Sequence, residues 1–199
     1  MNFRRVGETG LLVEVDEPAL HLATALAERD LPGVSDVVPA ERTLLLRFDP
    51  RRTDAGTLEA TVRATTTAAV DLSDETVTLD VVYDGEDLAE AAALAGLDVP
   101  ALVAAHAAAT WRVMFSGFAP GFGYLRCDDR RLDVPRRDTA RTRVPAGSVA
   151  LAAGYSGVYP TASPGGWQLI GRTDARLWDL DRDPPALLRP GVRVRFRMV

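Results

Sequence analysis

Hydrophobic and polar residues alternate most plainly at the end of this 199-residue chain. Val192, Val194, Phe196 and Met198 are separated by single arginines, which is the period of two that a β-strand with one buried face requires. From Thr110 onward the hydrophobic runs are short and are broken by glycine and proline. Many short strands joined by such turns are typical of a β-barrel or a β-sandwich. We predict one of these for the second half of the chain.

The first part of the chain mixes helical and strand patterns, and Pro18 lies near the start of the first helical segment. We expect a small ferredoxin-like domain over residues 1–83, because the order of the predicted elements is that of a ferredoxin-like α+β fold. A second domain should then cover residues 84–199. The predicted elements are a strand at 11–15, a helix at 18–28, strands at 33–38 and 43–48, a helix at 53–67 and a strand at 76–83.

Two alanine-rich helices are expected at the start of the second domain. Asp87 followed by Glu90 resembles a capping box, and Gly96 marks the end of this helix. Pro100 begins the next helix, which contains His106. The predicted fold class is therefore α+β, with helices in both domains.

Composition limits the classes of function. A hydrophobic content of 47% is ample for a buried core, and a net charge of −5 argues against a nucleic-acid partner. No apolar run approaches the roughly 20 residues that cross a bilayer, and no secretory signal follows the charged N-terminus. The single cysteine, Cys127, cannot form an internal disulfide. We therefore expect a cytoplasmic protein that does not act at a membrane.

All 23 basic residues are arginine. A P-loop, a pyridoxal Schiff base and a biotin attachment site each need a lysine, so this chain carries none of them. Anions would have to be held by arginine forks, by backbone amides or by another polypeptide.

Two glycine-aromatic segments, residues 117–125 and 163–173, are the most distinctive parts of the sequence. Glycine permits backbone geometry that a side chain would forbid, and large aromatic residues supply rigid walls beside it. The aromatic residues of the first segment could simply be core, and Pro120-Gly121 could be only a turn. Alternatively, this segment forms the edge of a site for a small ligand or a partner.

The arginine-rich stretch from Pro135 to Gly147 lies between these segments. A solvated basic surface is one interpretation of such a run. Because Arg141 and Arg143 precede a rigid turn with open amides, we favour binding of a carboxylate or a phosphate. In the second glycine-aromatic segment, Gln168 and Arg172 are four residues apart and should share a face of a strand, opposite Trp167.

The usual catalytic sets are missing from the sequence. No histidine or cysteine has the spacing of a metal site, so we expect no metal. Asp128 and Asp129 should raise the pKa of Cys127 and disfavour a thiolate nucleophile. His106 has two interpretations, as a hydrogen-bonded packing residue or as a polar group beside the first glycine-aromatic segment.

Read in order, these motifs resemble the family of the 5-oxoprolinase B subunit, also labelled allophanate hydrolase subunit 1, carboxyltransferase subdomain, or KipI-type kinase inhibitor. The resemblance is weak before residue 80 and strong after it. The motifs that carry it are 82–88, 106–113, 117–125, 141–149, 159–160, 163–173 and 190–196.

The resemblance implies a small α/β domain followed by a cyclophilin-like β-barrel. It further implies a complex with a homologous C subunit and with an A subunit, which cleaves 5-oxo-L-proline to L-glutamate using ATP bound on a partner. The alternatives are an inhibitor of a sensor histidine kinase and a carboxyltransferase-like component working with a biotin carrier. The binding candidates that it implies are His106, Phe118, Pro120, Gly121, Tyr124, Arg141, Arg143, Gly165, Gly166, Trp167 and Gln168.

Overall fold

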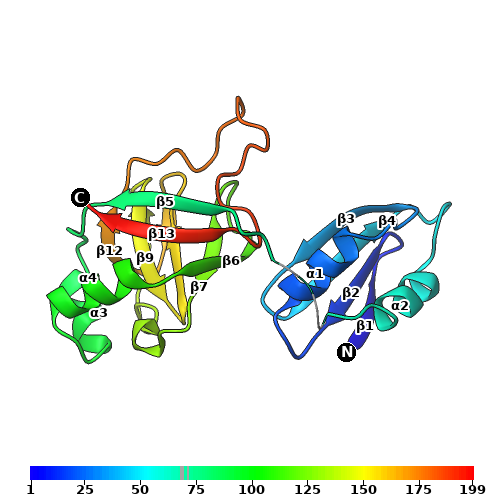
Figure 1. Ribbon diagram of the computed structural model, residues 1–199, viewed down its shortest axis with the longest axis horizontal. Helices are drawn as coiled ribbons and strands as arrows, with labels where there is room; N and C mark the ends of the chain where they lie inside the picture. The colour runs from blue at the N-terminus through cyan, green and yellow to red at the C-terminus, as the bar shows by residue number, and fades with distance from the viewer. Residues whose placement is uncertain (68–69, 71) are drawn as a thin grey trace. The chain divides into compact units, whose positions relative to one another are not determined.

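The computed structural model describes residues 1–67, 70 and 72–199. The chain divides into two compact units, Met1–Leu72 and Ser73–Val199. Each unit has its own hydrophobic core and is described by itself (Figure 1).

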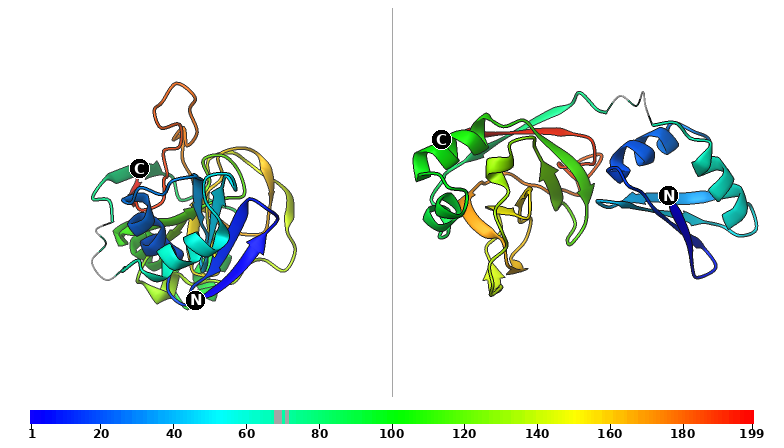
Figure 2. Two further views of the ribbon diagram at one scale, coloured as in Figure 1. Left: turned by 90° about the vertical axis from the view of Figure 1, so that its right-hand side faces the viewer. Right: turned by 90° about the horizontal axis from the view of Figure 1, so that it is seen from below.

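The first unit is a four-stranded antiparallel sheet with two helices. The strands follow the order β1-β2-β4-β3, and both helices lie on the same face of the sheet (Figure 2). Their apolar stripes and the inner face of the sheet form the core, which includes Leu26, Leu46 and Val62. The elements are β1 (Asn2–Val6), β2 (Gly10–Glu14), α1 (Ala19–Ala27), β3 (Val34–Pro39), β4 (Thr43–Phe48) and α2 (Ala55–Arg63).

The boundary predicted after residue 83 is corrected by strand pairing. The predicted strand at 76–83 is present as β5 (Thr76–Val81), but it pairs in parallel with β13 (Arg193–Met198) of the second unit. The fourth strand of the first unit is β1, which pairs with β2 and which the sequence analysis missed. β1 is almost entirely exposed, so its sequence lacks the buried alternation that reveals a strand.

The second unit is a cyclophilin-like β-barrel. Seven strands follow the order β12-β9-β10-β7-β6-β13-β5. Reciprocal backbone hydrogen bonds between Val82, just after β5, and Arg172 at the end of β12 join the two edges of this sheet. Strands β8 (Arg141–Val144) and β11 (Ser163–Gly165) form a separate antiparallel pair. The other barrel elements are β6 (Trp111–Ser116), β7 (Gly123–Arg126), β9 (Ser148–Ala152), β10 (Tyr155–Val158) and β12 (Gln168–Arg172), with a short 3₁₀ helix at Arg130–Leu132.

Helices α3 (Leu88–Leu94) and α4 (Val99–Ala108) pack on β12 and β13 respectively. Asp98 caps α4 by accepting a hydrogen bond from the Ala101 N–H at 2.8 Å, as its place before Pro100 favours. The capping box predicted at Asp87 is wrong, because its side chain makes no cap hydrogen bond to α3. That carboxylate instead binds arginines from elsewhere in the barrel unit.

Alternate residues of the barrel strands belong to two different hydrophobic clusters, one inside the barrel and one outside it. Val149 and Leu151 of β9 face the barrel interior, whereas Ala150 and Ala152 belong to a second cluster on the outside. Half of the outer cluster is aromatic, and it includes parts of both glycine-aromatic segments. The candidate site is therefore expected on the outer face, because the barrel interior is filled by side chains.

His106 belongs to the interior core. Its Nδ1 lies 2.7 Å from the Tyr83 hydroxyl and its Nε2 lies 3.0 Å from Ser156 Oγ. The side chain is completely buried, and its ring packs against those of Trp111 and Phe196. The packing interpretation of His106 thus fits the structure, and no part of the ring is open to a ligand.

Burial of this histidine makes the barrel unit acid-sensitive. Burial lowers the pKa of His106 from 6.5 to about 3, so between these values the unfolded chain binds a proton that the folded chain does not bind. The stabilisation is complete above pH 6.5 and is lost as the pH falls, at about 1.4 kcal/mol per pH unit between the two pKa values. We expect the free energy of unfolding to fall by about 2–3 kcal/mol more between pH 6 and pH 4 in the wild type than in His106→Gln.

Urea unfolding followed by tryptophan fluorescence measures this difference, because Trp111, Trp167 and Trp178 all lie in the barrel unit. Groups other than His106 titrate in both proteins and cancel in the comparison. Parallel pH profiles for the wild type and His106→Gln would contradict the expectation.

Within the part of the chain that the structure describes, no single helix is long and apolar enough to span a membrane. Helices α3 and α4 pass that test only when taken together, and they are bent by 85° at the break between them.

Candidate functional site

The first glycine-aromatic segment forms the tip of the β6–β7 hairpin. The Phe122 N–H donates to the Ala119 carbonyl at 3.0 Å, which closes a turn with Pro120 second and Gly121 third. Gly121 has a φ of +85°, as the third residue of a type II turn requires. The predicted turn role of Pro120-Gly121 therefore fits the structure.

Phe118, just before this turn, has a strained backbone. Its φ is +70°, and the Ala119 N–H donates to the Gly117 carbonyl at 2.8 Å across it. This is a γ-turn of the rare, positive-φ kind. The phenylalanine side chain is nevertheless 58% exposed. Strain that presents a large apolar side chain to solvent is a frequent mark of a functional position.

Phe118 is the outermost member of a group of aromatic rings that we call the aromatic face. Phe122 lies at its centre, with ring centroids 5.3 Å from Phe118, 5.0 Å from Tyr124 and 5.5 Å from Trp167. Most of these pairs are edge-to-face, an arrangement that aromatic quadrupoles favour. The members of the aromatic face are Phe115, Phe118, Phe122, Tyr124, Tyr155, Tyr159 and Trp167.

Glycines allow these rings to pack directly on the backbone. A Cβ on Gly157 of β10 would lie 2.8 Å from Phe122 Cζ and 3.0 Å from Trp167 Cζ3. A Cβ on Gly165 would lie 2.3 Å from the Tyr159 hydroxyl oxygen. The second glycine-aromatic segment therefore wraps closely around Tyr159, and the backbone N–H of Trp167 lowers the pKa of the Tyr159 hydroxyl, against the effect of burial.

A matched pair of glycines tests this packing. We expect Gly165→Ala to lower the free energy of unfolding of the barrel unit by about 1–3 kcal/mol, because the new methyl group must displace Tyr159. Gly166→Ala should be nearly neutral, because its Cβ would meet Ala140 at 3.6 Å and Arg136 Nη2 at 3.8 Å, both ordinary contacts. Urea unfolding of both variants checks this. Equal effects at the two positions would contradict the packing described.

Arg136 lies at the edge of the aromatic face. The Arg137 N–H donates to the Gly166 carbonyl at 2.9 Å, which holds this part of the chain along the second glycine-aromatic segment. Burial raises the pKa of Tyr124 and Tyr159, and the positive charge of Arg136 opposes both rises. Arg136 is exposed, and among the described residues it has no ion-pair partner. It is thus a free cation beside two phenols.

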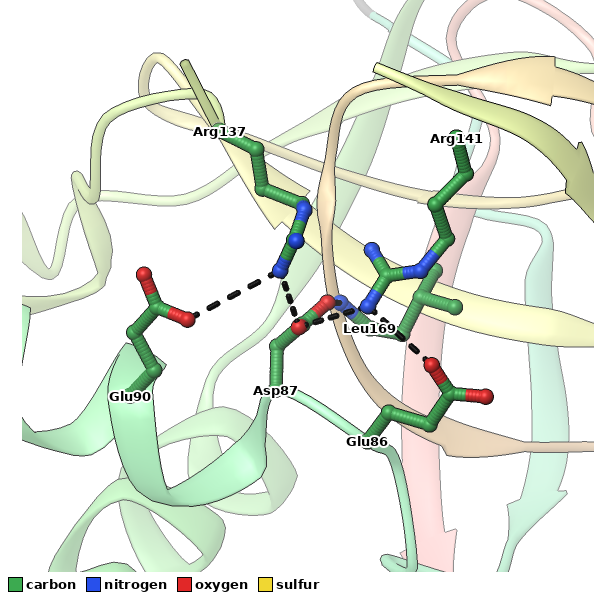
Figure 3. A network of polar contacts seen from close by, with 6 residues as sticks. All are labelled: Glu86, Asp87, Glu90, Arg137, Arg141 and Leu169. Atoms are coloured by element: carbon green, nitrogen blue, oxygen red, sulfur yellow. Dashed lines mark hydrogen bonds and ion pairs between the residues drawn. The ribbon is translucent and has the colours of Figure 1, made fainter. Parts of the chain in front are cut away.

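The neighbouring arginines are already paired with carboxylates. Figure 3 shows Arg137 and Arg141 converging on Asp87, whose Oδ1 accepts from Arg137 Nη1 at 2.5 Å and from Arg141 Nη2 at 2.7 Å. The other oxygen of Asp87 accepts from the Leu169 N–H at 2.8 Å. Glu86 also pairs with Arg141, at 3.2 Å. This network ties the start of α3 to β8 and β12.

The charge balance of this network favours ionised Asp87. Burial alone would raise the pKa of Asp87, but hydrogen bonds from Arg141 and the Leu169 N–H, together with the charges of both arginines, lower it. Arg141 Nη2 holds carboxylates of the same chain, whereas its buried Nη1 has no hydrogen-bond partner among the described residues. The ligand-binding role of Arg141 stays a prediction. Arg143, two residues along β8, is exposed.

The pairing predicted for Gln168 and Arg172 is also corrected. Gln168 is 1% exposed and pairs with Leu151, which faces the barrel interior. Arg172 is exposed and forms an ion pair with Asp84 at 2.9 Å. A register shift between Leu169 and Gly171 breaks the alternation that the prediction assumed. The two side chains do not form one polar surface.

Cys127 behaves as expected. Its pKa is raised, mainly by burial and also by the charges of Asp129 and Asp128. The aspartates that the sequence indicated contribute less than burial does. Among the described residues, no group of three or more histidine, cysteine or acidic side chains has the arrangement of a metal site.

The structure thus brings together some, but not all, of the binding candidates predicted from the sequence. His106 and Gln168 lie in the barrel interior, and Arg141 belongs to the Asp87 network. Sequence reasoning did not select Tyr159 or Arg136, although Tyr159-Pro160 and the arginine-rich stretch were both visible signals. The predicted residues that meet at the aromatic face are Phe118, Tyr124, Gly165, Gly166 and Trp167. Pro120 and Gly121 form the turn between Phe118 and Phe122, where Gly121 lies against Leu177 and Trp178.

The fold defines the class of protein, one with a cyclophilin-like barrel, and the comparisons with known proteins give the family. The model of the carboxyltransferase domain, subdomain C and D, matches residues 1–188. The chain belongs to this family.

Curated relatives are more specific. The chain is 40% identical over 204 residues to the B subunit of 5-oxoprolinase from Escherichia coli O157:H7, covering 96% of this chain and 93% of that protein. It is 31% identical over 216 residues to the B subunit of 5-oxoprolinase from Bacillus subtilis strain 168, covering 96% and 90%.

Solved structures place the fold in the same group. TTHA0988 is 39% identical with a TM-score of 0.82, and the match covers 96% of this chain but 40% of TTHA0988. PH0987 of Pyrococcus horikoshii, a conserved uncharacterized protein, is 31% identical with a TM-score of 0.60, covering 100% and 97%. The urea amidolyase of Kluyveromyces lactis, 20% identical with a TM-score of 0.73, shares the fold over 99% of this chain and 15% of its own.

Proposed function

We propose that this chain is the B subunit of a 5-oxoprolinase, a hydrolase complex that opens the cyclic amide of 5-oxo-L-proline to give L-glutamate. The observation that carries the proposal is the full-length similarity to two proteins of that name. Because the curated relatives carry the hydrolase name, we rank this function above a KipI-type kinase inhibitor and a carboxyltransferase-like component.

The residues of the chain support a non-autonomous role. The aromatic face offers apolar walls, phenol hydroxyls and a free guanidinium, but it contains no nucleophile with a base and an orienting group. His106 is fully buried and Cys127 has a raised pKa, so neither supplies this chemistry. We propose that a homologous C subunit packs over the aromatic face and completes the cavity.

ATP use is proposed for the complex as a whole. The lactam is unusually stable, and transfer of a phosphoryl group to it would give an intermediate that water opens more easily. The lysine-free chain has no P-loop, so we assign ATP binding to a partner, with the A subunit as the third component. The free thiol of Cys127 is compatible with a reducing cytoplasm, where we propose that the complex works.

Reconstitution tests this function. The purified chain should release no glutamate from 5-oxoproline and ATP, whereas addition of the A and C subunits should give glutamate and ADP together. The matched control is the mixture of both partners without this chain. Failure of the complete mixture to consume 5-oxoproline would reject the proposed function.

A further inference from the structure

The arginines near the aromatic face differ sharply in what they contact. Arg137 and Arg141 share the carboxylate of Asp87, at 2.5 Å and 2.7 Å. Arg137 also approaches Glu90, at 3.7 Å. With two guanidinium groups and three carboxylates, counting Glu86, this network has no positive charge left to attract a further anion.

Arg136 is placed differently. Its guanidinium reaches the second glycine-aromatic segment, where Nη2 would lie 3.8 Å from a Cβ on Gly166. Its charge acts on the hydroxyls of Tyr124 and Tyr159, which belong to the aromatic face. The side chain is exposed, and the described carboxylates leave it unpaired. An arginine with neutral hydroxyls around it keeps its full charge for a ligand.

The substrate of the proposed function has matching chemistry. 5-Oxoproline is a small five-membered lactam that carries one carboxylate, which is ionised at neutral pH. A planar guanidinium binds a carboxylate through two parallel hydrogen bonds, and aromatic walls bind the ring by apolar contact. Tyr124 and Tyr159 offer such walls within reach of the Arg136 charge, and the ring of Phe118 lies 6.1 Å from that of Tyr159.

We propose that Arg136 is the specificity-determining residue that binds the substrate carboxylate, while the lactam ring packs against Phe118 and Tyr124 of the aromatic face. This inference rests on the proposed function. It makes the carboxylate, and not the lactam, the group that this chain recognises. The lactam bond is then left facing the partner that completes the cavity.

Steady-state kinetics of the reconstituted complex test the assignment. Arg136→Gln should raise the KM for 5-oxoproline by about 10- to 100-fold, the cost of a lost charge-assisted hydrogen-bond pair, with a smaller change in kcat. Arg136→Lys should lie between the wild type and Arg136→Gln, because it keeps the charge but loses the fork. Arg195→Gln, at an exposed arginine of β13, is the matched control and should leave the KM unchanged.

A lactam without a carboxylate shows whether Arg136→Gln loses recognition of the carboxylate or simply misfolds. Inhibition by 2-pyrrolidinone should be equally strong in the wild type and in Arg136→Gln, since that ligand has no carboxylate to lose. An unchanged KM in Arg136→Gln would overturn the assignment. An equal weakening of both ligands would also overturn it, because it indicates a merely structural role.

A binding measurement keeps this inference distinct from the proposed function. If the wild-type mixture does not turn over 5-oxoproline, the fluorescence of the chain is titrated with 5-oxoproline and with 2-pyrrolidinone. A response to 5-oxoproline that exceeds the response to 2-pyrrolidinone, and that is lost in Arg136→Gln, supports the carboxylate site. No difference between the wild type and Arg136→Gln overturns it.

Discussion

Replacing Asp87 by alanine is expected to destabilise the barrel unit by about 3–5 kcal/mol, because it leaves two partly buried guanidinium groups without their shared carboxylate. The Asp87 side chain is only 4% exposed, and the side chains of Arg137 and Arg141 are 28% and 17% exposed. Loss of the carboxylate also removes the acceptor for the Leu169 N–H. Asp87→Asn should be nearly as damaging, since it keeps the shape but removes the charge.

A surface ion pair of the same barrel supplies the control for Asp87. Asp80 of β5 pairs with Arg197 of β13 at 2.6 Å, with side chains 49% and 66% exposed. Because solvent screens such pairs, Asp80→Ala should leave the unfolding midpoint in urea almost unchanged. Equal destabilisation by the Asp87 and Asp80 substitutions would show that the Asp87 network is no stronger than a surface pair.

The second large predicted effect is a loss of turnover when Phe118 is replaced. Phe118→Gly should reduce 5-oxoproline turnover by the reconstituted complex at least about tenfold, as loss of an aromatic anchor does. The free energy of unfolding should change by no more than about 1 kcal/mol. Glycine relieves the positive-φ strain, and this relief offsets the loss of the ring contacts. Phe118→Ala should show the same loss of turnover without this relief, so it should be the less stable of the two.

Leu94→Ala is the control for an exposed apolar residue outside the aromatic face. Leu94 lies on α3 and is 45% exposed, so its truncation should change neither turnover nor stability. Turnover by Phe118→Gly equal to that of the wild type would contradict a functional role for Phe118. Parallel losses of turnover and stability would indicate a packing role instead.

The sequence predicted those elements whose signals are local. The alternation from Val192 to Met198 is the strand β13, and the segments at 11–15, 33–38 and 43–48 are strands of one sheet. The partner of a strand is not a local property. β5 has a plain strand pattern, yet only its pairing with β13 shows that it belongs to the barrel.

In the candidate site, too, features set by local sequence were predictable and features set by tertiary contacts were not. The turn at Pro120-Gly121 was predictable because proline and glycine each restrict the turn type. The different orientations of Gln168 and Arg172 were not, since the register shift between Leu169 and Gly171 in β12 reverses the face of the residues that follow it. The role of Asp87 was hidden because a helix cap and a buried ion pair use the same residue type at the same position.

Arg136 illustrates a different limit of sequence analysis, which cannot tell a paired arginine from an unpaired one. Four arginines between 136 and 143 look alike in the sequence, and only the tertiary structure shows which of them carboxylates of this chain neutralise. Asp87 is about 50 residues away from its two partners. Without that contact, Arg141 and Arg136 cannot be distinguished.

Amide hydrogen exchange of the assembled complex, with and without 5-oxoproline, tests the central claim that the outer aromatic face is the functional surface. The substrate should slow exchange at the two glycine-aromatic segments, residues 117–125 and 163–173, and should leave α4 around His106 unchanged. Protection confined to α4 or to the first unit, with both glycine-aromatic segments unaffected, would contradict the claim.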